Sequence, residues 1–118
     1  MHRFRELKIW QVSRLLVKDV YQMTESFPST EMYGLASQMR RAVVSISSNI
    51  AEGAGRETNK DFCRFLDIAI GSAFEVETQV VLATDLDFTT EECSNVVFKN
   101  LHELQNMIYG FKKYLAKS

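Results

Sequence analysis

The sequence holds few of the residues that build disulfide frameworks or metal centres. Its 118 residues include two cysteines and two histidines. Cys63 and Cys93 stand alone without CxxC spacing, and His2 and His102 are equally solitary. Metal and redox centres need ligands gathered at characteristic spacings. The sequence therefore predicts free thiols, no metal site and no cofactor.

Long apolar runs and an excess of charge of one sign are also missing. No run approaches the roughly 20 apolar residues that span a bilayer, and residues 1–10 are charged where a signal peptide would be apolar. Fourteen basic and fifteen acidic residues give a formal net charge of -1, unlike strongly basic nucleic-acid binders, so any anion site must be local. We expect a cytoplasmic protein without a membrane span, folded as one domain over residues 1–118.

Apolar residues recur every three or four positions in four segments, and the strict alternation of a β-strand appears in none. The pattern predicts helices over about 5–25, about 30–52, from 58 or 59 to about 83, and from 89 or 90 to about 115. Pro28 prevents the first helix from continuing. Four long helices with short connections pack most simply as an all-α, antiparallel, up-down-up-down four-helix bundle.

Local signals predict where the middle helices begin and end. Residues 29–30 and 89–90 are serine or threonine, which favour N-cap positions of the second and fourth helices. Gly53 and Gly55 follow the second apolar stripe. Because glycine accepts the left-handed conformation that ends many helices, we expect these two residues to terminate the second helix, where one of them either has a positive φ or allows a tight backbone approach.

A polar ridge follows the second predicted helix at steps of three and four, and a shorter polar row follows the third. The ridge consists of Arg41, Ser45, Asn49, Glu52 and Arg56, and the row of Ser72, Glu75 and Gln79. One interpretation is a structural network in which Arg41 pairs with Glu75, while the other polar groups, Gln38 included, satisfy one another or a neighbouring chain. Catalysis would need a nucleophile with a base, or carboxylates around a metal. Neither is evident, so we expect no enzymatic activity.

Basic residues around this ridge favour a second interpretation, in which arginine and lysine contact phosphates. The planar guanidinium donates two parallel hydrogen bonds to a phosphate, and backbone amides near residues 53–58 would assist at the start of the third helix. The candidate nucleic-acid-binding residues are Arg40, Arg56, Lys60 and Arg64, with Arg41 beside them.

Three stretches carry a resemblance to a known family: FRELKIW, FPSTEMYGLASQMRRAVVSISSNIAEGAGR and DFCRFLDIAIGSAFEVETQVVLA. Together they resemble the bacterial four-helix bundle proteins encoded in intervening sequences of 23S ribosomal RNA genes, often called the S23 family. The resemblance implies a homopentamer, similar in build to the accessory variability determinant proteins of diversity-generating retroelements, which bind nucleic acid through positive surfaces. The family pattern falls on Gln38, Arg40, Arg41, Asn49, Glu52, Gly53, Gly55, Arg56, Gly71, Ser72 and Glu75.

Residues and resemblance together predict a non-enzymatic, oligomeric helical protein that binds RNA or another nucleic acid through a local basic surface. The alternative is a protein-binding scaffold whose polar ridge serves contacts between subunits. In both cases the partners are other copies of the chain and a macromolecule, and no small-molecule substrate is evident.

Overall fold

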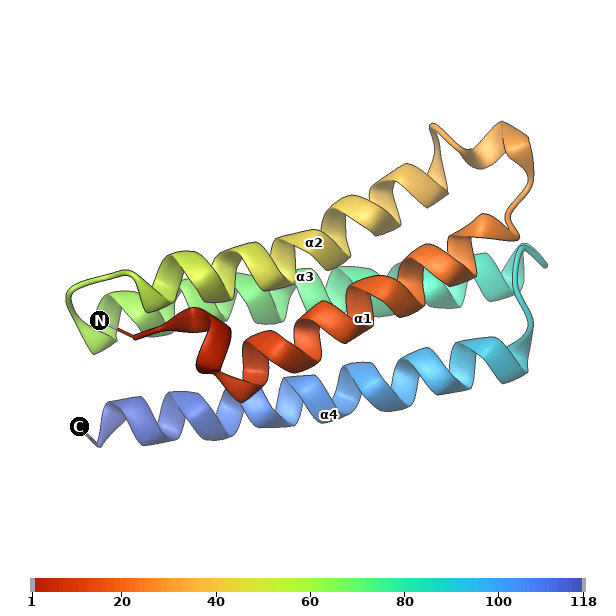
Figure 1. Cartoon of the computed structure of the whole chain (residues 1–118). Helices are drawn as coiled ribbons and strands as arrows, with labels where there is room; N and C mark the ends of the chain where they lie inside the picture. The colour runs from red at the N-terminus through yellow and green to blue at the C-terminus, as the bar shows by residue number, and fades with distance from the viewer. Residues whose placement is uncertain (1, 118) are drawn as a thin grey trace.

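The computed structural model describes residues 2–117, and every regular element in that range is helical. The α-helices are α1 (Lys8–Glu25), α2 (Leu35–Ala54), α3 (Asn59–Asp85) and α4 (Glu91–Ala116), and two short 3₁₀ helices, η1 (Phe4–Glu6) and η2 (Ser29–Glu31), precede α1 and α2. Successive α-helices run in opposite directions along a body of 46 × 23 × 20 Å (Figure 1). The predicted four-helix bundle is confirmed.

The core lies between the apolar stripes that the sequence predicted. Side chains at 0–1% exposure come from all four helices, among them Leu16, Ile46, Leu66 and Leu104. Neighbouring helices contact around the ring in the order α1, α2, α3, α4, and the α2–α3 pair packs most extensively. Small residues on α3, such as Ala69 and Ala73, are fully buried, which allows this close approach.

Threonine side chains begin the two long helices of the second half. The hydroxyl of Thr58 accepts a hydrogen bond from the Asp61 amide, and that of Thr90 accepts one from the Cys93 amide, both at 3.1 Å. The cap predicted at residues 89–90 is confirmed at Thr90. Each cap satisfies one of the amides that a helix start leaves without a partner.

The first two helices begin later than the sequence suggested. Residues 4–6 form η1, and Leu7 is extended (φ -76°, ψ 128°), so α1 begins at Lys8. Residues 29–31 likewise form η2 instead of the first turn of α2, which begins at Leu35 after Gly34. The predicted cap at Ser29 or Thr30 is therefore wrong, because the Glu31 carboxylate accepts the hydrogen bond from the Leu35 amide at 3.1 Å.

The glycines near the end of α2 do not adopt the predicted left-handed conformation. Within residues 2–117 the only positive φ belongs to Asp87 (61°). Gly55 is the C-cap of α2 with φ -85°, and Gly53 lies inside the helix. A Cβ on Gly53 would stand 2.7 Å from Cδ1 of Phe62 and 2.8 Å from Cβ of Phe65. Gly53 is thus a point of close helix contact and not a helix terminator.

Among the described residues, no helix combines the length and apolar character needed to cross a membrane.

Candidate nucleic-acid interface

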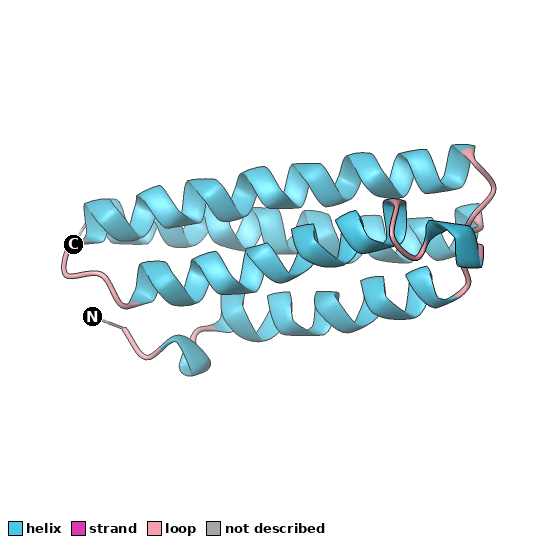
Figure 2. Cartoon of the chain, turned by 90° about the horizontal axis from the view of Figure 1, so that it is seen from above, coloured by secondary structure: helices cyan, strands magenta, loops and turns pink. Residues whose placement is uncertain are grey.

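The antiparallel topology separates charges that are mixed along the chain. We define the basic half as the part of the bundle built from residues 2–16, 45–72 and 104–117, where both ends of the described chain and the α2–α3 turn meet (Figure 2). It contains ten of the fourteen basic residues but five of the fifteen acidic ones. The remaining acidic half, residues 17–44 and 73–103, contains four basic and ten acidic residues. The net charge of -1 therefore conceals two ends of opposite sign.

The N-terminal segment is fastened to the α2–α3 turn and brings its arginines to the same end. The His2 amide donates a hydrogen bond to the Ala54 carbonyl at 2.8 Å. The His2 ring packs edge-on against Phe62, with centroids 5.2 Å apart. These contacts place the segment that carries Arg3 and Arg5 at the end of the bundle where α3 begins.

Three of the four predicted nucleic-acid-binding residues, Arg56, Lys60 and Arg64, lie exposed in the basic half. Lys60 and Arg64 are one helical turn apart on α3. The Arg56 guanidinium lies over the Phe65 ring at 4.6 Å from its centroid. None of the three forms an ion pair within residues 2–117, so their charges are available to an anionic ligand.

Lysines at the end of α4 add to this surface to different degrees. Lys112 donates a hydrogen bond to the Asp67 carboxylate on α3, and this bond raises the pKa of Lys112 above its usual value while burial opposes the change. Its charge is therefore partly compensated. Lys113 and Lys117 are exposed and belong to none of the ion pairs of the described chain.

Arg40 lies apart from the other three predicted residues, in the acidic half. Its Nε donates a hydrogen bond to the buried hydroxyl of Thr24 at 2.9 Å, and its guanidinium lies over the Tyr21 ring at 4.6 Å. These contacts fasten the end of α1 to α2. The structure therefore separates Arg40 from the surface formed by Arg56, Lys60 and Arg64.

The polar ridge of α2 is a structural network only at its centre. The hydroxyls of Ser45 and Ser72 share a hydrogen bond of 2.9 Å between α2 and α3. The Asn49 amide donates to both the carbonyl and the hydroxyl oxygen of Ser45, at 2.8 and 3.0 Å. This part of the ridge joins the two helices where they pack most closely.

The predicted Arg41–Glu75 pair is wrong for the single chain. Both residues are exposed, and the ion pairs within residues 2–117 do not include either of them. Gln38 and Glu52 are exposed as well. Arg41, Glu52 and Glu75 are therefore exposed, and Ser45 and Ser72 make the hydrogen bond between α2 and α3.

Sequence reasoning missed several contacts between helices. Ser13 and Ser47 share a hydrogen bond of 2.9 Å between α1 and α2, and Thr84 and Ser94 share one of 2.6 Å between α3 and α4. It also missed Trp10 and the N-terminal arginines. The missed arginines had a signal in the sequence, because an up-down bundle necessarily places the start of α1, the α2–α3 turn and the end of α4 together.

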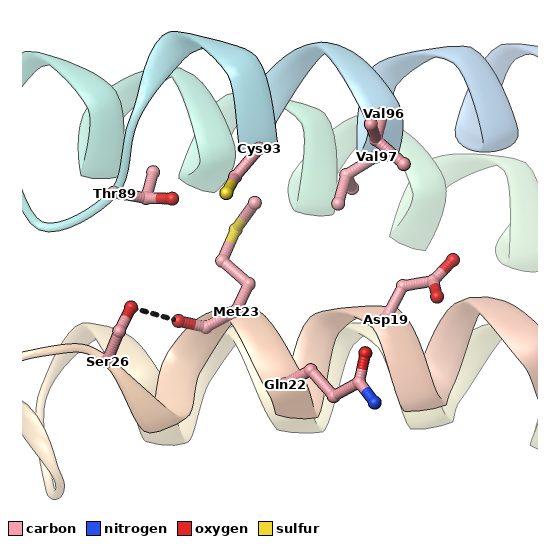
Figure 3. A pocket seen from close by; sticks show the side chains of 8 residues that line it. All are labelled: Asp19, Gln22, Met23, Ser26, Thr89, Cys93, Val96 and Val97. Atoms are coloured by element: carbon pink, nitrogen blue, oxygen red, sulfur yellow. Dashed lines mark hydrogen bonds between the residues drawn. The ribbon is translucent and has the colours of Figure 1, made fainter.

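A pocket of about 370 Å³ between α1 and α4 does not extend the basic surface (Figure 3). Its lining is apolar apart from a few uncharged polar groups and Asp19, whose carboxylate accepts a hydrogen bond from Asn100 at 3.1 Å. Cys93 faces this pocket without a histidine beside it. Across residues 2–117 no group of three or more His, Cys, Asp or Glu side chains is placed to hold a metal ion.

The architecture defines a small four-helix bundle with one basic end. The family model of the 23S rRNA-intervening sequence proteins matches residues 5–110, and the chain belongs to this family. A crystal structure of a protein of unknown function from the S23 ribosomal protein family of Bacteroides thetaiotaomicron VPI-5482 is similar, with a TM-score of 0.79 and 20% identity over 89% of this chain and 98% of that one. No curated protein matches the sequence.

Proposed function

We propose that the protein is a non-enzymatic nucleic-acid-binding protein whose basic half contacts the phosphates of RNA or another nucleic acid. The observation that carries this proposal is the segregation of ten basic residues against five acidic ones at one end of the bundle. Guanidinium and ammonium groups are common phosphate ligands in proteins. In the basic half, most of these groups form no ion pair with a carboxylate of the described chain.

The acidic half does not cancel this attraction at physiological salt. The Debye length is then about 8 Å, whereas the bundle is 46 Å long. A nucleic acid bound at the basic end is screened from most of the carboxylates at the other end. The local charge of the basic half, and not the net charge of -1, therefore determines the attraction.

Salt dependence tests this proposal. A fluorescently labelled single-stranded RNA, titrated at several potassium chloride concentrations, should bind with log K falling linearly as log salt rises. Each neutralised phosphate contributes a slope of about -0.7 for a single strand, so three or more contacts predict about -2 or steeper. Absence of binding at about 50 mM salt, or an affinity that salt does not change, would contradict nucleic-acid binding.

We also propose that the chain acts as a homo-oligomer, with the pentamer that the family resemblance implies as the expected assembly. Four large apolar side chains on α3 are 45–50% exposed: Ile68, Phe74, Val81 and Leu82. They lie along the side of α3 that does not face the core, together with the exposed Gly71. Exposed apolar area of this kind is typical of surfaces that contact another protein.

Mass measurement tests the assembly. The parent protein should have a molar mass several times 13.6 kDa by light scattering, and the double substitution Ile68→Glu/Phe74→Glu should reduce it toward the monomer value, since burying two carboxylates opposes association. Lys99→Glu, on the exposed surface of α4, is the control. If the parent protein is a monomer, the homo-oligomer proposal is wrong. The apolar face of α3 would then be a contact surface for a different protein, which favours the scaffold function.

A further inference from the structure

An open pocket of about 700 Å³ lies on the outer side of α1 in the basic half, where η1 folds back against the first turns of the helix. Its lining combines two aromatic rings, two arginines and an amide: Phe4, Trp10, Arg5, Arg14 and Gln11. The pocket has a volume typical of ligand sites. It contains no acidic side chain in its lining.

The aromatic part of the pocket is held in place but remains accessible. The Phe4 ring packs edge-on against Trp10, with centroids 5.1 Å apart at 68°. Trp10 is half-buried and lines the pocket, so part of the indole is accessible from it. The ring offers apolar surface for contact with a ligand.

The charged part of the pocket is free to bind an anion. Arg5 and Arg14 are exposed and belong to none of the ion pairs within residues 2–117. The Arg14 guanidinium lies over the Trp10 ring at 5.7 Å from its centroid, so the two planar groups lie close together at the pocket. Nε2 of Gln11 donates to the Arg5 carbonyl at 2.9 Å and so positions the backbone that carries Arg5.

We propose that this pocket binds an unpaired base of a single-stranded nucleic acid, with Trp10 and Arg14 stacking against the base and Arg5 contacting an adjacent phosphate. The inference rests on the proposed nucleic-acid binding and specifies its substrate class. Aromatic and guanidinium planes stack on bases whose faces are free, as in single strands. A duplex keeps its bases stacked inside, so it can use the basic half but not this pocket.

The chain's single tryptophan makes the pocket directly observable. A single-stranded RNA should quench Trp10 fluorescence, whereas an abasic strand with the same number of phosphates should bind about tenfold more weakly and leave the fluorescence nearly unchanged. Trp10→Ala should lower affinity for the base-containing strand about tenfold without changing the salt slope, because stacking releases no counterions. Trp10→Phe, which keeps a ring, should restore most of the affinity.

Tyr33→Ala is the matched control, because Tyr33 is 96% exposed and lines a pocket with Arg40 and Arg41 in the acidic half. This substitution should leave the affinity unchanged. Equal affinity of the parent protein for both strands would overturn the base-binding pocket, yet salt-dependent binding of both would leave the proposed function standing. Binding of neither strand would overturn both. The strand comparison uses the parent protein, so it decides the question even if Trp10→Ala does not fold.

Discussion

Gly53→Val should destabilise the protein by roughly 3 kcal/mol, which is near the upper end of the cost of overpacking a core. The new Cβ would lie 2.7 Å from Cδ1 of Phe62 and 2.8 Å from Cβ of Phe65. Phe62 is 1% exposed, and its ring also packs edge-on against Phe111 at 5.4 Å between centroids. Cβ of Phe65 moves only with its backbone, so no rotamer change relieves the contact. Denaturant unfolding followed by circular dichroism measures the loss.

Two other glycines provide the controls for this prediction. A Cβ on Gly55 would have Glu52 O as its nearest neighbour at 3.6 Å, and one on Gly110 would meet nothing within 4 Å. Gly55→Ala should therefore change stability by less than about 0.5 kcal/mol. Gly110→Ala, inside α4, should stabilise this helix by about 0.5–1 kcal/mol through helix propensity. If Gly53→Val unfolds like the parent protein, α2 and α3 do not approach as closely as described.

The different roles of Gly53 and Gly55 show that a local sequence pattern does not determine the role of a glycine near a helix end. Both follow an apolar stripe, and both fit the composition of a helix end. Local sequence cannot distinguish a glycine that ends a helix from one that admits a neighbouring ring, because the second role depends on a residue of another helix. Only the position of Phe62 against Gly53 separates them.

The four α-helices were predictable because each carries a strong apolar stripe. The start of α4 was predictable because threonine is a good N-cap residue, and Thr90 occupies that position. The start of α2 was not. Residues 29–31 satisfy the same local preferences as a first helical turn but form η2, and Glu31 caps Leu35 from outside the helix. A carboxylate four residues before the first amide lies outside the usual capping pattern, so the cap at Glu31 could not be predicted from the sequence.

The candidate site was predictable only in part, because spacing along one helix does not determine which residues it brings against the next helix. Spacing along α2 and α3 correctly indicated a polar contact between these helices, but it could not specify which residues make it. Ser45 and Ser72 share a hydrogen bond, whereas Arg41 and Glu75 are exposed and belong to none of the ion pairs within residues 2–117. The net charge of the chain does not show where the charges lie, so it could not predict the basic half. The predicted topology, in contrast, already implied which segments meet at each end of the bundle.

Two triple variants of equal net charge can show whether RNA binding depends on where the positive charges lie or only on how many there are. Arg56→Ala/Lys60→Ala/Arg64→Ala removes three exposed positive charges from the basic half, and Lys18→Ala/Arg41→Ala/Lys99→Ala removes three from the acidic half. Both have a net charge of -4, compared with -1 for the parent protein. They therefore differ in where the charge was removed and not in how much.

The variant of the basic half should bind single-stranded RNA about a hundredfold more weakly at 0.1 M salt, because each lost phosphate contact contributes roughly a factor of five there. Its salt slope should become shallower by about two. The variant of the acidic half should keep a slope close to that of the parent protein and lose much less affinity, since Lys18, Arg41 and Lys99 lie outside the basic half and do not line the Trp10 pocket. Removing Arg56 also ends its contact with Phe65, worth about 0.5–1 kcal/mol of stability, so thermal melts should confirm that both variants are folded at the assay temperature. Equal losses of affinity in the two variants would mean that net charge alone governs binding, and the basic half would then have no special role as the interface.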